Sequence, residues 1–266
     1  MEISTIIGLI LGIIALVFGM ILKGAPIINL VNNPAAYLII FGGTIATIFM
    51  AFPMSEVKKI PKLFKIVFTK PKLIDKVSLI SMFVEWASIT RREGLLALES
   101  KVEEIDDDFL RGGMRMIIDG NDQEFVRDVL MEDIHATEDR HKVGALIFSQ
   151  AGMYAPTLGV LGAVVGLIAA LADLSDMDKL SHAIAAAFIA TLLGIFSGYV
   201  LWHPIANKLK RMSKLESEVK LMMVEGLLSI QSGVSTIAIN QKLSVFLTPR
   251  ERAELANKEG GTGEKE

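Results

Sequence analysis

Four long stretches of the chain contain no Asp, Glu, Lys or Arg and are mostly apolar: 3–22, 24–54, 143–172 and 183–207. A helix needs about 20 apolar residues to cross a bilayer core of about 30 Å, so each stretch is long enough to span a membrane. With 52% hydrophobic residues and a mean hydropathy of +0.48, the chain is not an ordinary soluble enzyme, a secreted disulfide scaffold or a disordered protein.

Several other classes of protein do not fit this pattern. Aromatic residues make up 7% of the chain and alternating ten-residue segments are absent, which argues against an outer-membrane barrel. The first stretch is longer than the apolar core of a signal peptide, and the only charge before it is Glu2, so we expect a retained transmembrane helix. The absence of cysteine excludes disulfides, thiolate nucleophiles and thiolate-bound metals, and the histidines show no metal-ligand spacing.

The charges between the four spans predict their orientation. Clusters of Lys and Arg follow span two, at 58–72, and span four, at 208–214, whereas the short connections 23–33 and 173–182 hold one Lys each. Lys and Arg near span ends stay in the cytoplasm. We therefore expect a multi-pass membrane protein with the large loop and both termini in the cytoplasm.

The large loop begins with a predicted basic amphipathic helix at 54–68. Apolar residues recur there at helical spacing with lysines between them. Such a helix suits the inner-leaflet surface, so membrane lipid is an expected partner. In the rest of the loop, apolar residues recur with the 3.6-residue period of helices, which predicts several soluble helices. We find no strand pattern in the chain.

The last two spans are predicted to extend beyond the membrane. The stretch 143–172 is about 45 Å long as a helix, more than a bilayer requires, and the apolar period of span four continues past Pro204. The expected fold is an all-α membrane protein with four transmembrane helices, a helical cytoplasmic domain between spans two and three, and long cytoplasmic extensions of spans three and four. The expected divisions are a transmembrane hairpin at 1–54, a loop domain at 55–142, pore-forming spans at 143–204, a helical extension at 205–247 and a disordered tail at 248–266.

Spans three and four differ from the first two in their regularly spaced small residues. These residues are Gly152, Ala155, Gly159, Gly162, Ala163, Gly166 and Ala170 in span three, and Ala183, Ala187, Ala190, Gly194 and Gly198 in span four. Small faces let helix backbones approach closely. The two faces either pack on each other or surround a partner helix, and the residues alone leave both arrangements open.

Two further residues in these spans have both a structural and a functional interpretation. Pro156 frees the carbonyl of Gly152 and is either a tolerated proline or a hinge beside an ion path. Thr191 either bonds its own backbone or coordinates an ion or water. Neither span contains a carboxylate, although ion pumps and proton relays need an ionisable group in the membrane. If this protein conducts ions, the titrating carboxylate belongs to another chain.

The motifs in these two spans resemble a known family. The signature of the MotA/TolQ/ExbB proton-channel family is similar to residues 151–166 (AGMYAPTLGVLGAVVG), and its second membrane motif is similar to 190–194 (ATLLG). The loop segment 90–99 and the four-span layout resemble the MotA-like flagellar stator branch, because TolQ- and ExbB-like members normally have three spans. The resemblance covers the chain to about residue 247.

The resemblance implies a location in the bacterial cytoplasmic (inner) membrane, a function, partners and site residues. MotA-like proteins form a pentameric ring around two helices of a MotB-like single-span partner, which supplies a membrane aspartate, and ion flow then drives torque on the rotor protein FliG. It implies no enzymatic activity, no bound metal, no cofactor besides the transported ion and no nucleic-acid partner. Matched to the family's motifs, the ion pathway comprises Pro156, Ala163 and Thr191, conformational coupling involves Pro156 and Pro204, and the rotor contact comprises Arg91 and Glu99.

The expected transported ion is the proton. Sodium needs several oxygen ligands, whereas a proton needs a carboxylate and a water path. Sodium-driven members of the family typically carry a threonine where this sequence has Ala163, so Thr191 would be the only matched hydroxyl in the pore. Thr157 could add a second hydroxyl, but the sequence does not show whether its side chain faces the pore. Two other functions remain open: a TolQ/ExbB-like energiser of envelope processes, and a solute transporter, for which we find no convincing inverted repeat.

Overall fold

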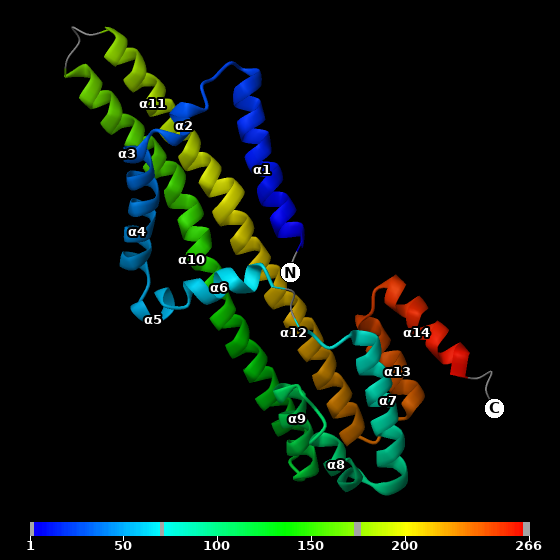
Figure 1. Ribbon diagram of the computed structural model, residues 1–266. Helices are drawn as coiled ribbons and strands as arrows, with labels where there is room; N and C mark the ends of the chain where they lie inside the picture. The colour runs from blue at the N-terminus through cyan, green and yellow to red at the C-terminus, as the bar shows by residue number, and fades with distance from the viewer. Residues whose placement is uncertain (1–2, 70–71, 173–176, 263–266) are drawn as a thin grey trace. The chain divides into compact units, whose positions relative to one another are not determined.

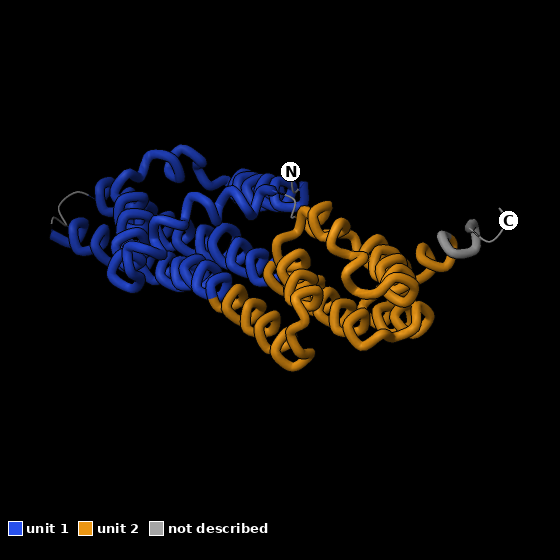
Figure 2. The backbone as a smooth tube through the Cα atoms, turned by 90° about the horizontal axis from the view of Figure 1, so that it is seen from below, with its two compact units in different colours: residues 1–71, 140–212 blue, residues 72–139, 213–266 orange. Residues whose placement is uncertain are grey.

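The computed structural model describes residues 3–69, 72–172 and 177–262, with side chains to residue 257. Within these ranges every regular element is helical. By length and composition, four helical runs can cross a membrane: Ile3–Leu22, Pro34–Ala51, Gln123–Leu171 and Met177–Gln231. The predicted all-α fold with four spans is therefore confirmed. The chain divides into two compact units, residues 1–71 with 140–212 and residues 72–139 with 213–266 (Figure 2).

The first two spans form the expected hairpin in the first unit (Figure 1). Its elements are α1 (Ile3–Leu22), α2 (Ile28–Val31), α3 (Pro34–Tyr37), the π-helix η1 (Leu38–Gly42) and α4 (Gly43–Ala51). Gly24 has a φ of +67°, a conformation that favours glycine in the turn after α1. The side chain of Asn33 caps α3 by accepting from the backbone N–H of Ala36, and it donates to the carbonyl of Ala186 at 3.1 Å. Asn33 thus connects the hairpin to span four.

The basic segment after span two forms two short helices, α5 (Met54–Val57) and α6 (Ile60–Val67). Its lysines are exposed, but its apolar face is covered by protein: Val67 packs with Phe148 of span three and Ile205 of span four. The expectation that this face lies on the inner leaflet is therefore wrong, because the long helices supply an apolar surface within the same unit. Contact between the lysines and lipid headgroups stays a prediction.

Spans three and four are long helical runs, as predicted. Span three lies within α10 (Gln123–Leu171), and span four comprises α11 (Met177–Phe196), the π-helix η3 (Ser197–Trp202) and α12 (His203–Gln231). Pro204 has no N–H to donate to Val200, and the wider π-turns of η3 lie directly before it, which lets the helix continue. Of the expected outer connection 173–182, residues 173–176 lie outside the described residues, and the remainder is helical from Met177.

The second unit has its own apolar core. Its helices are α7 (Lys76–Glu93), the 3₁₀ turn η2 (Leu95–Leu98), α8 (Glu99–Val102), α9 (Asp108–Ile118), parts of α10 and α12, α13 (Thr236–Leu243), the 3₁₀ turn η4 (Ser244–Phe246) and α14 (Pro249–Thr262). Glycines allow close packing in this core. A Cβ atom at Gly226 of α12 would lie 2.5 Å from the ring of Phe83, and one at Gly113 of α9 would lie 2.5 Å from Leu227. Both α7 and α9 therefore pack tightly on α12.

Helix α14 lies where we predicted a disordered tail. It begins with a capping box, in which the backbone N–H of Thr248 donates to the Glu251 carboxylate at 2.7 Å and the Glu251 N–H donates to the Thr248 hydroxyl at 3.4 Å. The hydrogen bond from the Thr248 hydroxyl holds the pKa of Glu251 below its usual value. Leu255 is buried in the core of the second unit. The prediction is thus wrong for the described part of the tail, and residues 263–266 lie outside the described residues.

Candidate functional site

Spans three and four touch through their backbones. A Cβ atom at Gly159 of α10 would lie 2.8 Å from the carbonyl oxygen of Ala190 and 2.9 Å from the Cα of Gly194 on α11. A Cβ at Gly194 would lie 2.7 Å from the carbonyl oxygen of Ala155. Only glycine fits at these two positions, since backbone atoms cannot move aside as side chains do. At this crossing the small-residue faces pack on each other, and no partner helix can enter between them.

The carbonyl freed by Pro156 lies in the same helix pair. A Cβ at Gly198 of η3 would lie 2.8 Å from the carbonyl oxygen of Gly152 and 2.8 Å from the Cγ of Pro156. Gly152 and Gly198 are both buried, and the ring of His203 covers Gly152 on a further side. The freed carbonyl is therefore covered by protein. This geometry favours a conformational role for Pro156 over an exposed carbonyl beside an ion path.

The other two predicted ion-pathway residues are half-buried. Ala163 lies two helical turns beyond Pro156, on the same side of α10. The hydroxyl of Thr191 on α11 donates to the carbonyl of Ala187 at 3.3 Å, which is the backbone bond we weighed from the sequence. Thr157 is exposed, and its hydroxyl donates to Met153 at 3.4 Å. Farther along α10, a Cβ at Gly166 would meet no other atom within 4 Å. The small-residue faces of spans three and four are therefore no longer in contact at Gly166.

Pro204 is exposed and lies apart from the helix crossing, at a cavity between α1, the end of α6 and span four. The structure therefore does not bring the two coupling prolines together. Pro156 contacts Gly198, whereas Pro204 follows the π-helical segment η3. The irregular turns of η3 thus contain Gly198, the contact of Pro156, and end before Pro204, and such π-turns often mark functional sites in helices.

The predicted rotor-contact residues Arg91 and Glu99 lie on two helices. Arg91 is in the last turn of α7, Gly94 adopts a φ of +86° that ends the helix, and Glu99 begins α8 after the turn η2. Both charged residues are exposed, and neither forms an ion pair with another described residue. The turn between them presents Leu96, whose exposed fraction is 70%. The exposure of Leu96 has no signal in the sequence, because neighbouring leucines at helical spacing are typical of a core.

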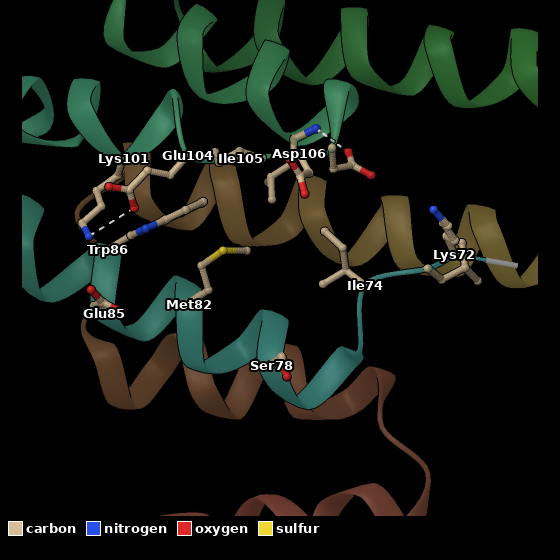
Figure 3. Close-up of a pocket in the computed structure, with 13 residues that line it drawn as sticks. Lys72, Ile74, Ser78, Met82, Glu85, Trp86, Lys101, Glu104, Ile105 and Asp106 are labelled. Atoms are coloured by element: carbon tan, nitrogen blue, oxygen red, sulfur yellow. Dashed lines mark hydrogen bonds and ion pairs between the residues drawn. The ribbon is translucent and has the colours of Figure 1, made fainter.

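The second unit also contains an open cavity of about 850 Å³ between α7, the α8–α9 connection and the segment before α7 (Figure 3). Carboxylates of Glu85 and Asp106 lie at its edge, and Lys101 forms an ion pair with Glu104 at 3.5 Å. Among the described residues, no three His, Cys, Asp or Glu side chains gather closely enough to hold a metal ion. The cavity carries no evident catalytic arrangement.

Comparisons with known proteins assign the family. The model for the motility protein A N-terminal region matches residues 6–94, and the model for the MotA/TolQ/ExbB proton channel family matches residues 101–222. A relative from Bacillus subtilis (strain 168), "Motility protein A", is 53% identical over 266 residues, covering 100% of this chain and 98% of the relative. This chain belongs to the MotA/TolQ/ExbB proton channel family. The family resemblance seen in the sequence is thus confirmed.

Other relatives and solved structures agree with this family assignment. The "Chemotaxis protein PomA" of Vibrio alginolyticus is 32% identical over 95% of this chain and 98% of its own. The flagellar MotAB stator complex from Bacillus subtilis matches with a TM-score of 0.89 and 54% identity, over 94% of this chain and 98% of that chain. The MotAB structure of C. jejuni matches with a TM-score of 0.88 and 31% identity, over 94% and 97%.

Proposed function

We propose that this chain is an ion-conducting stator subunit of a bacterial flagellar motor, which couples proton flow to torque together with a MotB-like partner. The observation that carries the proposal is the packing of spans three and four, which are held backbone to backbone at Gly159 and Gly194 and contain no carboxylate. Ion transfer through such helices needs an ionisable group from another chain. Two solved structures similar to this chain are of MotAB complexes, which supports a partner of that kind.

The assembly and orientation follow from the same proposal. The chain forms a homo-oligomer, a pentamer as implied by its family, in the bacterial inner membrane, with both termini and the second unit in the cytoplasm. The distribution of Lys and Arg supports this orientation. The second unit then contacts the rotor protein FliG. We expect no enzymatic activity, no bound cofactor and no nucleic-acid partner. The match to the motility protein A N-terminal region argues against a TolQ/ExbB-like role, and membership of the family argues against a solute transporter.

The rotor contact provides the test of this function. Reversing either predicted contact charge, with Arg91→Glu or Glu99→Lys, is expected to reduce motor torque several-fold while leaving membrane level and partner assembly unchanged. Both side chains are exposed, so their reversal disturbs no packing, and opposite charges on the two surfaces steer a contact that must form and release repeatedly. Torque is measured from the rotation speed of tethered cells under load.

A matched control is Glu124→Lys, since Glu124 is exposed in the first turn of α10 and belongs to the same unit. It should leave torque unchanged. Restoration of torque by an opposite reversal on the rotor would identify the charge contact directly. Unchanged torque in both Arg91→Glu and Glu99→Lys would refute the assignment of these residues to the rotor contact.

The transported ion gives a second prediction. Swimming is expected to continue in sodium-depleted medium and to stop when a protonophore collapses the proton gradient. The hydroxyl of Thr191 already bonds Ala187, and Ala163 contributes no oxygen, so too few side-chain ligands remain for a selective sodium site. Thr157 is exposed and supplies one further hydroxyl at most.

The variant Ala163→Thr tests the pore position itself, and Ala169→Thr, at an exposed alanine of the same helix, is the matched control. We expect altered ion flux for the first variant and unchanged flux for the second. Swimming that stops without sodium and survives the protonophore would reverse the ion assignment.

A further inference from the structure

A second cavity lies in the first unit, lined by residues from the beginning of α1, the end of α6 and span four. Its volume is about 410 Å³, within the range of about 300–1,000 Å³ typical of sites for small organic ligands. The lining has two chemically different parts. One part is polar, with Ser4, Thr5 and Lys208, and the other is apolar, with Gly8, Leu9 and Val200.

The polar part is organised by hydrogen bonds between three elements. The ammonium group of Lys208 on α12 donates to the hydroxyl of Thr5 on α1, and the Thr5 hydroxyl donates to the carbonyl of Val67 at the end of α6 at 3.4 Å. Lys208 and Thr5 are both half-buried. These bonds hold the cationic group at the wall of the cavity, so an anion there would meet an ammonium positioned by Thr5.

The position of the cavity along both helices places it at a membrane boundary. Thr5 lies at the very start of the charge-free stretch 3–22, and Lys208 is the first charged residue after the charge-free stretch 183–207. Charged side chains at span ends lie in the headgroup region. The apolar part, at Gly8 and Val200, lies farther inside both stretches and therefore at the depth of the acyl chains.

We propose that this cavity binds an anionic phospholipid, with the phosphate beside Lys208 and Thr5 and the upper part of one acyl chain along Gly8 and Val200. A cationic end at the headgroup level joined to an apolar end at the acyl level matches the amphipathic structure of a phospholipid, and a soluble anion would leave the apolar part unused. The proposal rests on the membrane assignment and is independent of the motor function.

Lipid retention by the full chain, coexpressed with its MotB-like partner, tests the site. The purified complex is equilibrated with mixed vesicles of phosphatidylglycerol and phosphatidylcholine, and bound lipid is extracted and quantified by mass spectrometry. Loss of the charge in Lys208→Gln is expected to weaken phosphatidylglycerol retention about fivefold and to leave phosphatidylcholine unchanged. Gly8→Leu is expected to reduce phosphatidylglycerol retention with the charge intact, because Gly8 lines the apolar part and a Cβ there meets no atom within 4 Å, so a leucine would compete with an acyl chain for this space.

Each variant has a matched control. Lys210 is an exposed lysine of the same helix that does not line the cavity, and Gly19 is an exposed glycine of α1 with the same open surroundings. Lys210→Gln and Gly19→Leu should retain phosphatidylglycerol as the unmodified protein does, and excess inorganic phosphate should not displace it. Equal losses in Lys208→Gln and Lys210→Gln would show general attraction to the surface and overturn the proposal. Equal behaviour of Gly8→Leu and Gly19→Leu, or displacement by inorganic phosphate, would also overturn it.

Discussion

The chain reconstituted into liposomes without its partner is expected to give no proton flux above that of empty liposomes. Its candidate pore-forming spans contain no carboxylate, and their crossing at Gly159 and Gly194 brings backbone atoms into contact, which leaves no room for water between them. The imidazole of His203, the one histidine in the charge-free stretch 183–207, is packed over Gly152. Flux is measured with a pH-sensitive dye trapped in the liposomes under an imposed membrane potential.

Coreconstitution with the MotB-like partner should produce flux, and neutralising the partner's membrane aspartate should return it to the level of empty liposomes. This comparison separates a missing titratable group from a failure of the chain to insert. Robust flux from the chain alone would contradict the proposed division of roles. In that case His203→Gln would be the informative variant, because a loss of this flux would assign proton transfer to the imidazole.

The spans and their lengths were predictable from the sequence because the physical requirement is local. A charged residue in the bilayer core costs at least about 2.5 kcal/mol, so a membrane helix is visible as a charge-free stretch. The same reasoning predicted the long helices through Pro156 and Pro204, since prolines are tolerated where neighbouring helices and irregular turns accommodate the lost hydrogen bond. The π-turns before Pro204 are the local form of that accommodation.

The features that the sequence did not predict depend on contacts between distant residues. The burial of α6 against Phe148 and Ile205 requires the long helices to lie beside it, and no property of residues 54–68 shows this. The burial of the Gly152 carbonyl depends in the same way on Gly198. By contrast, α14 had a readable local signal that we did not use, because Thr248 and Glu251 have the spacing of a capping box. For the candidate site, motif matching selected Pro156 and Thr191, but only the structure shows what their backbone neighbours are.

Gly194→Ala is expected to abolish swimming and to lower the thermal unfolding midpoint of the purified protein by several degrees. The added methyl group would lie 2.7 Å from the carbonyl oxygen of Ala155 and 2.8 Å from the Cα of Gly159, so the two helices must separate. Overpacking of this kind costs about 1–3 kcal/mol, and each kcal/mol shifts the midpoint by about 2–4 °C in a protein of this size. Swimming is scored on soft agar and the midpoint by scanning fluorimetry in detergent.

Gly19→Ala is the matched control, since a Cβ there meets no atom within 4 Å and alanine favours a helix over glycine by about 0.5–1 kcal/mol. It should leave swimming intact and the midpoint unchanged or slightly raised. If Gly194→Ala behaves like this control, the backbone contact between spans three and four is not present in the working protein. Gly159→Ala should match Gly194→Ala, and the double variant should cost less than the sum of the two, because helices already separated by one methyl group accommodate the second more easily.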